Sequence, residues 1–149
     1  MTTVQRIIKR KGTDVWSTRP DATVFEALEL MAEKKIGALL VMDDDRLVGL
    51  FSERDYARKI ILLRRRSQET QVSEIMTDKL HTVSADTTVS ECMNLMTKHH
   101  IRHLPVMEDE RVMGMLSIGD LVSSIIDEQQ FTIQQLGSYI SGAYQAIDD

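Results

Sequence analysis

The feature that most constrains this sequence is an internal repeat. Residues 49–55 read GLFSERD and residues 114–120 read GMLSIGD, so Gly-x-x-Ser-x-x-Asp occurs twice at an offset of 65 positions. At the same offset, residues 21–61 and 86–126 share about 17 identical residues without a gap. A register kept over this length indicates two copies of one structural unit.

Both copies carry the same signals for secondary structure. The sequence Thr-x-x-Glu at 23–26 and at 88–91 is a capping box, in which the hydroxyl and the carboxylate satisfy free amides at the start of a helix. Apolar residues at helical spacing follow each box for about 12 residues. Two short apolar runs joined by an acidic turn come next and predict a β-hairpin. The helical pattern then resumes at Glu53 and at Ile118.

Short extended segments at 15–18 and 81–84 complete each copy as β-α-β-β-α, which predicts an α/β fold. A weaker match before them relates VQRII at 4–8 to VSEIM at 72–76. Because one copy of about 60 residues buries too little apolar surface to be stable alone, we expect the two tandem copies to pack about a pseudo-twofold axis. An amphipathic C-terminal helix is expected over 131–147. The expected division is repeat 1 at 1–66, repeat 2 at 67–126 and a helical extension at 127–149.

The composition excludes several classes of protein. With 23 acidic and 18 basic residues the net charge is −5, so the surface as a whole repels nucleic acid and anionic membranes. No apolar run approaches the roughly 18 residues that a membrane span needs. Cys92 is the single cysteine, which rules out an intramolecular disulfide and fits a reducing compartment. We therefore expect a cytoplasmic protein, although the basic start of the chain also fits a mitochondrial presequence.

The Ser-x-x-Asp part of the motif has two compatible interpretations. Structurally, Ser52 with Asp55 and Ser117 with Asp120 are variant capping boxes. Functionally, a helix start offers amides and a positive dipole to a phosphate, and a carboxylate one turn later accepts hydrogen bonds from ribose hydroxyls. The upstream glycine lets another group approach the strand backbone closely. The combination describes a nucleotide site without excluding a purely structural role.

The repeated unit resembles the CBS domain, named after cystathionine β-synthase, and the pair resembles a Bateman module. The resemblance covers residues from about 4 to 126 and rests on MAEKKIGALLVMD, HHIRHLPVMED and the two Gly-x-x-Ser-x-x-Asp motifs. It implies a regulatory or sensor module whose ligand is an adenosine nucleotide (AMP, ADP, ATP or NAD(H)), bound in clefts between the copies. It also implies a homodimer, with the C-terminal helix as an extra interface, and an effector protein of unknown identity.

The resemblance assigns residues to two clefts by position. In each, the motif aspartate holds the ribose, the motif serine lies near ribose or phosphate, and the base lies against backbone of the other copy. One cleft would combine Ser52 and Asp55 with Thr82, Ile101, Arg102 and His103. The other would combine Ser117 and Asp120 with Thr18, Ile36, Gly37 and Ala38.

The two motifs differ in charge, and the difference favours the first cleft for a ligand with phosphates. Residues 52–55 read SERD, so a guanidinium stands next to the ribose carboxylate, whereas residues 117–120 read SIGD without a cation. The candidate phosphate ligands are Arg54, Arg102 and His103. We therefore expect the cleft of the SERD motif to be the better site.

Other functions have weaker support in the sequence. His99, His100 and His103 suggest a metal site, but no Cys, Asp or Glu stands at a matching spacing, so no metal is predicted. No nucleophile elbow, Walker loop or GxGxxG after a strand is present, so we expect that the protein is not an enzyme. Two alternatives stay open. One is a CBS-fold scaffold that binds no nucleotide and uses both Ser-Asp pairs only as caps, and the other is a redox-linked protein for which the nicotinamide half of NAD matters.

Overall fold

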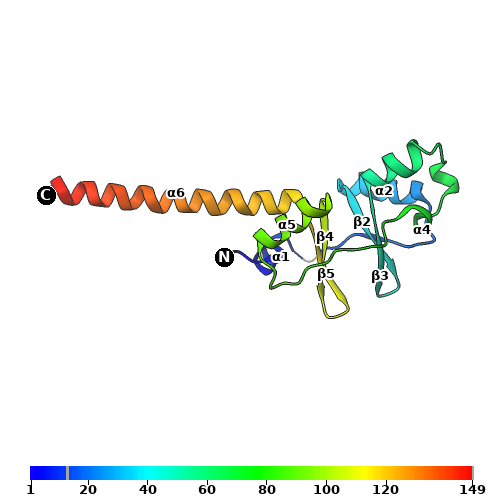
Figure 1. Cartoon of the computed structure of the whole chain (residues 1–149), viewed down its shortest axis with the longest axis horizontal. Helices are drawn as coiled ribbons and strands as arrows, with labels where there is room; N and C mark the ends of the chain where they lie inside the picture. Colours follow the sequence, from blue (N-terminus) through cyan, green and yellow to red (C-terminus); the bar gives the residue numbers. More distant parts are fainter. Residues whose placement is uncertain (13, 149) are drawn as a thin grey trace.

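The computed structural model describes residues 1–12 and 14–148, with side chains as far as residue 142. Two α/β units lie next to each other, and a long helix extends from one of them (Figure 1). The elements of the first half are α1 (Val4–Lys11), β1 (Ser17–Thr18), α2 (Val24–Lys34), β2 (Ala38–Asp43), β3 (Arg46–Ser52), α3 (Glu53–Tyr56), the π-helical turn η1 (Ala57–Ile61) and the 3-10 turn η2 (Ser67–Glu69). Those of the second half are α4 (Val72–Ile75), α5 (Val89–His99), β4 (His103–Glu108), β5 (Arg111–Ser117) and α6 (Ile118–Asp148). The predicted α/β fold of two tandem repeats and a C-terminal helix is confirmed.

The predicted helix starts are also confirmed. The hydroxyl of Thr23 accepts a hydrogen bond from the amide of Glu26 at 3.1 Å, and the carboxylate of Glu26 accepts one from the amide of Thr23 at 3.3 Å. The same two bonds join Thr88 and Glu91. α2 and α5 therefore begin directly after the two threonines, since the box satisfies amides that have no partner within the helix.

Each repeat contains one antiparallel hairpin, β2 with β3 and β4 with β5, and both hairpins have an irregularity of register in the same place. β1 adds a short parallel strand to β2. In the second repeat a single parallel bridge from Val83 to Val106 takes its place. β3 ends at Ser52 and β5 ends at Ser117, so each hairpin leads directly into a motif helix.

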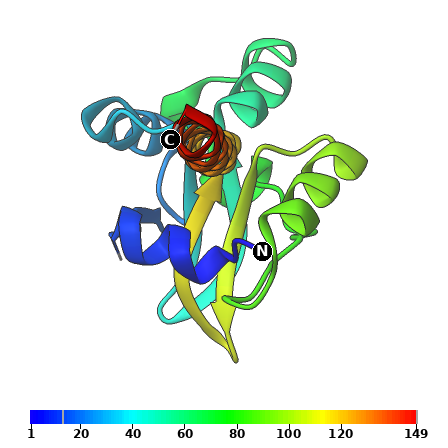
Figure 2. The ribbon, with the colours of Figure 1, turned by 90° about the vertical axis from the view of Figure 1, so that its left-hand side faces the viewer.

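The two repeats exchange their first helices. Val4 and Ile7 of α1 are buried in the core of the second repeat, together with side chains of α5, β4 and β5. Val72 and Ile75 of α4 are buried in the core of the first repeat, together with side chains of α2, β2 and β3. Figures 1 and 2 show α1 (blue) beside the second hairpin (yellow). Each core is therefore completed by a helix from the other half of the chain.

The motif glycines make room for these exchanged segments. A Cβ atom on Gly49 would lie 2.5 Å from Sδ of Met76, and one on Gly114 would lie 2.8 Å from Cδ1 of Ile8. Met76 directly follows α4, and Ile8 belongs to α1. The close approach that the glycines predict is therefore present, and the group that approaches each strand belongs to the protein itself.

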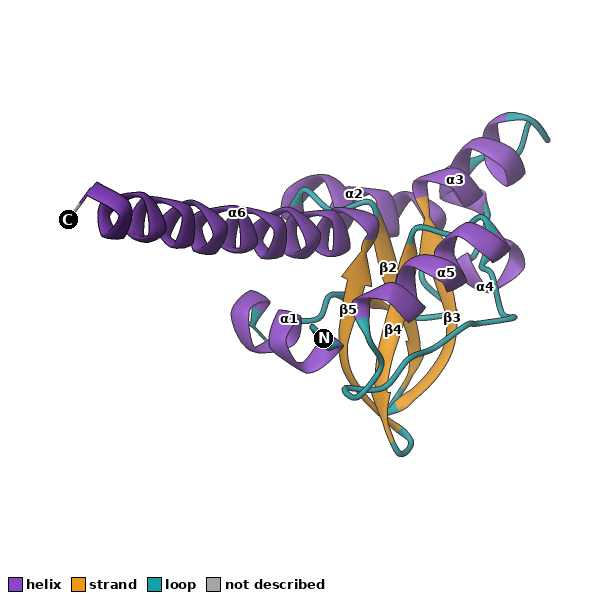
Figure 3. Ribbon diagram, turned by 60° about the vertical axis from the view of Figure 1, so that its left-hand side comes forward, coloured by secondary structure: helices purple, strands orange, loops and turns teal. Residues whose placement is uncertain are grey.

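The last element is one continuous helix. α6 runs for 31 residues, which corresponds to about 46 Å at 1.5 Å per residue. The helix expected at 131–147 is thus the continuation of the helix that starts after the second motif. Leu121 is buried in the core of the second repeat, and Ile118 and Ile125 pack against that core. The later turns of α6 extend away from both repeats (Figures 1 and 3).

We expect Gly49→Ala to lower the free energy of unfolding by about 1–3 kcal/mol, because a methyl group added to a packed site forces its neighbours apart. Besides contacting Met76, the new Cβ would lie 3.1 Å from the carbonyl oxygen of Thr77, which cannot rotate away. Gly114→Ala is the matched control with a smaller expected loss, because its close neighbour is the flexible end of Ile8. Urea denaturation measures both losses, and a larger loss for Gly114→Ala would contradict this packing.

Candidate functional site

Ser52 and Asp55 form a capping box at the start of α3. The amide and the hydroxyl of Ser52 donate to Oδ2 of Asp55 at 3.0 and 3.1 Å, and the amide of Asp55 donates to Oγ of Ser52 at 3.2 Å. The other carboxylate oxygen, Oδ1, accepts from the hydroxyl of Thr77 at 3.0 Å and lies 3.1 Å from Nζ of Lys59. Asp55 is only 7% exposed, so its carboxylate is a fixed anionic group held by protein partners.

A cavity of about 610 Å³ lies beside Asp55. The predicted site residues that line it are Ser52, Arg54 and Asp55 from the first repeat and Ile101, Arg102 and His103 from the second. Gly37, which the resemblance assigns to the other cleft, lines the same cavity. Thr82 does not line it; this residue is exposed and lines a separate depression beside α5. The structure therefore brings together every residue predicted for the first cleft except Thr82.

This cavity carries an excess of positive charge. Five Lys and Arg side chains and two carboxylates, those of Glu53 and Asp55, line it, in a chain whose net charge is −5. The cations are Arg54, Arg58, Lys59, Lys79 and Arg102. Sequence reasoning missed three of them. Lys59 could have been found, because it lies one helical turn after Asp55, whereas Lys79 reaches the cavity from the segment after α4.

Arg54 connects the two repeats across this cavity. Its guanidinium donates a hydrogen bond to the carbonyl oxygen of His100, the residue that ends α5. Arg54 belongs to α3 of the first repeat, so this bond joins the walls of the cleft. A phosphate bound here would compete with the carbonyl oxygen for the same N–H donors.

All four histidines of the chain line the cavity. The rings of His81 and His99 are stacked with their centroids 3.7 Å apart. Burial, followed by the charge of Lys11, holds the pKa of His103 below its ordinary value of 6.5, although Asp120 acts in the opposite direction. Desolvation and then His81 lower the pKa of His99. His99 and His103 are therefore protonated less readily than an ordinary histidine. Within residues 1–12 and 14–148, no group of three or more His, Cys, Asp or Glu is arranged to hold a metal ion.

The second motif is also capped, but a lysine from α1 holds its aspartate. The amide of Ser117 donates to Oδ2 of Asp120 at 2.8 Å, and the amide of Asp120 donates to Oγ of Ser117 at 3.2 Å. Nζ of Lys11 donates to the same Oδ2 and to the carbonyl oxygen of Met115, both at 2.7 Å. Burial raises the pKa of Asp120, but the hydrogen bonds from Lys11 and Ser117 outweigh it, so the pKa is lowered. Asp120 is already paired with a cation of the protein.

The residues predicted to accompany the second motif lie elsewhere. Thr18 lies in β1, Ile36 packs against the core of the first repeat, Gly37 lines the first cavity and Ala38 is buried in β2. The cavity beside Asp120, of about 1020 Å³, is formed by α1, the residues before it and α6. The structure therefore does not bring Thr18, Ile36, Gly37 or Ala38 into this cavity.

The two motifs differ most in the cations that follow the serine. At the offset of 65 positions, Arg54, Arg58 and Lys59 correspond to Gly119, Ser123 and Ser124. The second cavity is lined by three cations and three carboxylates, which are partly paired with each other, as in the ion pair of Arg10 with Asp127. Its charge is balanced, whereas the first cavity has a surplus of cations.

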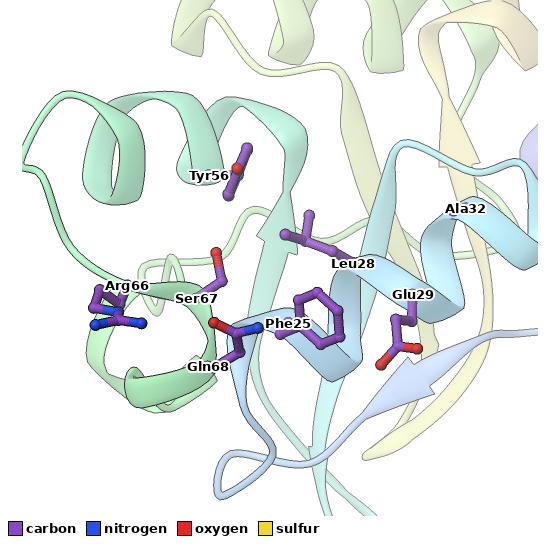
Figure 4. Close-up of a pocket in the computed structure, with 8 residues that line it drawn as sticks. All are labelled: Phe25, Leu28, Glu29, Ala32, Tyr56, Arg66, Ser67 and Gln68. Atoms are coloured by element: carbon purple, nitrogen blue, oxygen red, sulfur yellow. The ribbon is translucent and has the colours of Figure 1, made fainter.

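A further pocket, of about 520 Å³, lies between α2 and η2 in the first repeat. Figure 4 shows Phe25 and Leu28 of α2 on one side and Tyr56 and the turn η2 on the other. Its charged lining groups are Glu29 and Arg66, and it contains none of the predicted site residues. The candidate site is therefore the cationic cavity beside Asp55.

Comparison with known proteins identifies the repeated unit. The family model of the CBS domain matches residues 5–62 and again residues 72–127. CBS domain-containing protein CBSX3, mitochondrial, of Arabidopsis thaliana is 41% identical over 153 aligned positions, which cover 96% of this chain and 74% of the relative. A protein with CBS domains from Burkholderia ambifaria MC40-6, proposed to act in signal transduction, is 49% identical with a TM-score of 0.83, covering 89% of this chain and 99% of that chain.

A more distant structure is the hexameric CBS-CP12 protein from bloom-forming cyanobacteria, with 28% identity and a TM-score of 0.72, covering 82% of this chain and 71% of that chain. Among the helices of residues 1–12 and 14–148, α6 included, none combines the length and the apolar character that crossing a membrane requires. The family model matches both halves, and the relatives cover nearly the whole chain. The chain therefore belongs to the CBS-domain family and contains two CBS domains in tandem.

Proposed function

We propose that this chain is a regulatory module that binds an adenosine nucleotide in the cavity at Ser52 and Asp55. The observation that carries the proposal is the group of five cationic side chains around the motif aspartate, in a chain that is acidic overall. Cations gathered in one cleft repel each other, so packing alone does not favour this arrangement. An anionic ligand supplies the opposing charge.

The carboxylate of Asp55 suits the ribose. The cap at Ser52 uses Oδ2, whereas Oδ1 contacts Thr77 and Lys59. A ribose hydroxyl that binds Oδ1 in place of Lys59 leaves the helix cap intact. It also releases an ammonium group whose side chain is 39% exposed, which can then turn to a phosphate.

The phosphates are proposed to lie against Arg54, Arg58 and Arg102, with Lys79 beside them. Guanidinium groups bind phosphate through parallel N–H donors, and a lysine adds a point charge. The surplus of cations favours a ligand with two or three phosphates (ADP, ATP or NAD(H)) over AMP. The adenine is proposed to lie against the backbone of Ile101 and Gly37.

Binding of such a ligand would couple the two repeats. The lining residues come from α3 of the first repeat and from the turn between α5 and β4 of the second. A nucleotide that contacts both sides binds one arrangement of the repeats more tightly and shifts the population toward it. The effector protein is proposed to recognise that arrangement. No catalytic step is proposed for the site.

A second candidate function is a CBS-fold scaffold that binds no nucleotide. The observation in its favour is that Asp55 and Asp120 already accept hydrogen bonds from the protein, from Thr77, Lys11 and the two capping serines. Such a module would act through self-association, and one structural neighbour, the cyanobacterial CBS-CP12 protein, is a hexamer. The two functions differ in whether any nucleotide stabilises the protein.

We propose the cytoplasm as the site of action, with no nucleic acid or membrane as a partner. Cys92 is the single cysteine of the chain, which fits a reducing compartment. Burial raises the pKa of its thiol to about 11, so the thiol stays protonated at neutral pH. The mitochondrial relative makes the mitochondrion the second candidate compartment.

A thermal-shift experiment with AMP, ADP, ATP, NAD and NADH tests the nucleotide proposal. A ligand at about 100 times its Kd adds about 2.7 kcal/mol to stability, which is several degrees in Tm for a chain of this size. We expect the shift to be lost in Asp55→Ala and kept in Asp120→Ala, which removes the equivalent cap in the second repeat. If no nucleotide shifts the wild type, the scaffold function takes its place.

Replacing a cation of the first motif by its counterpart in the second should weaken binding. We expect Arg58→Ser to raise the Kd of ATP about 5- to 10-fold, because one charge-assisted contact is lost. Arg46→Ser, at the far end of the first hairpin, removes the same charge outside the cavity and serves as the control. Titration calorimetry gives both constants, and equal values for the two variants would refute a phosphate contact by Arg58.

The lowered pKa of His103 predicts a loss of stability in mild acid. Because its folded pKa lies below the ordinary value of 6.5, the unfolded chain takes up the proton first, and stability falls as the pH drops below that value. Urea denaturation at pH values from about 6.5 to 5 should show a smaller loss for His103→Gln than for the wild type. The lowered pKa of Asp120 affects stability only at pH values below its ordinary value of 3.8, so it does not contribute to the loss in mild acid. Identical profiles for variant and wild type would argue against a buried neutral His103.

A further inference from the structure

α6 exposes large apolar side chains along most of its length. The exposed fractions are 42% for Val122, 47% for Ile126, 67% for Ile133, 57% for Leu136 and 65% for Ile140. Figures 1 and 3 show that the outer half of the helix stands clear of both repeats. Because helices gain most of their stability from packing an apolar face, this stripe requires a partner.

The stripe has the spacing of a coiled-coil seam. Its members alternate at intervals of four and three residues and are Val122, Ile126, Gln129, Ile133, Leu136 and Ile140. A seven-residue repeat of this kind keeps one face of a helix turned toward a partner helix. The residues that attach α6 to the second repeat are different ones, Leu121 and Ile125. The seam therefore starts beside the second repeat and continues along the outer half of α6. Its residues stay available to a partner, because other side chains attach the helix to the repeat.

The chemistry of the seam favours a second copy of this chain as its partner. α6 contains no Lys or Arg, and residues 129–147 contain no charged side chain. Amphipathic helices that lie on membranes carry Lys and Arg on their polar face, so a membrane surface is disfavoured. Two copies that each carry a net charge of −5 repel each other, and the uncharged seam is a surface on which they meet without opposing like charges.

We propose that α6 pairs with α6 of a second copy as a parallel, two-stranded coiled coil. Isoleucine at the a positions of a seam with leucine at d favours two parallel strands, and Ile133 with Leu136 follows this pattern. In parallel register Gln129 faces its own counterpart, and each side-chain amide can donate to the other's carbonyl oxygen. An antiparallel pair would instead bury this amide against apolar side chains. The pairing does not depend on nucleotide binding, and it places the two cationic cavities at the same end of the dimer.

Cysteine cross-linking of the full chain tests the pairing and its direction. Gln129→Cys and Leu136→Cys place thiols in the seam, and Ser138→Cys places one on the opposite face as the matched control. The native Cys92 is fully buried and gives no background. Under mild oxidation we expect disulfide-linked dimers from both seam variants and at least about ten-fold less from the control.

Two outcomes of the cross-linking would overturn the proposal. In an antiparallel pair at most one of the two seam positions meets its own copy, so linking at a single position excludes the parallel direction. Equal linking of Ser138→Cys and the seam variants excludes the seam itself.

Light scattering tests whether the seam holds the dimer together. We expect the wild type at twice the chain mass of 17.0 kDa and Ile133→Asp at the mass of one chain, because the seam cannot bury an unpaired charge. Ser138→Asp, with the same charge on the opposite face, should remain a dimer. Thermal unfolding checks that the repeats of all variants stay folded. A monomeric wild type, or a dimeric Ile133→Asp, overturns the proposal.

Discussion

The exchange of α1 and α4 between the repeats is the constraint on which the rest of the structure depends. The amide of Val72 donates to the carbonyl oxygen of Ala22 at 2.8 Å, and the amide of Val89 donates to that of Thr2 at 3.0 Å. Backbone bonds thus tie each exchanged helix to the segment that starts a helix of the other repeat. Burying one Val or Ile is worth about 1.5–3 kcal/mol, so neither core can release its borrowed helix cheaply. The exchanged helices therefore keep the two halves of the cleft together.

The same exchange explains why the two motif sites differ. α1 delivers Lys11 to Asp120, and the segment after α4 delivers the corresponding lysine, Lys79, to the cavity of the first motif. There, however, Lys59 contacts Asp55, and Lys79 adds to the surplus of charge. One copy of the duplicated unit therefore neutralises its aspartate with an internal lysine. The other copy has a surplus of Lys and Arg side chains in its cavity, which remain available to an anionic ligand.

Local features were predictable from the sequence, and long-range placement was not. The capping boxes at Thr23 and Thr88 and the hairpins depend on residues within a few positions of each other. The short match between 4–8 and 72–76 indicates equivalent segments, but it contains no information on which core each one enters. Thr82 was predicted for the cavity, whereas its neighbour His81 lines it; in extended chain, successive side chains point to opposite sides, so an error of one position moves the side chain out of the site.

Because α6 is continuous, the second motif lies at the attached end of a long helix. Asp120 lies in the first turn of a rigid rod about 46 Å long. A rotation of about 5° at this turn moves the far end of the helix by about 4 Å, which exceeds the rise of two residues along a helix. The ion pair of Lys11 with Asp120 joins α1 to α6 at this first turn. Small changes in the angle between α1 and α6 therefore become large displacements at the far end of α6.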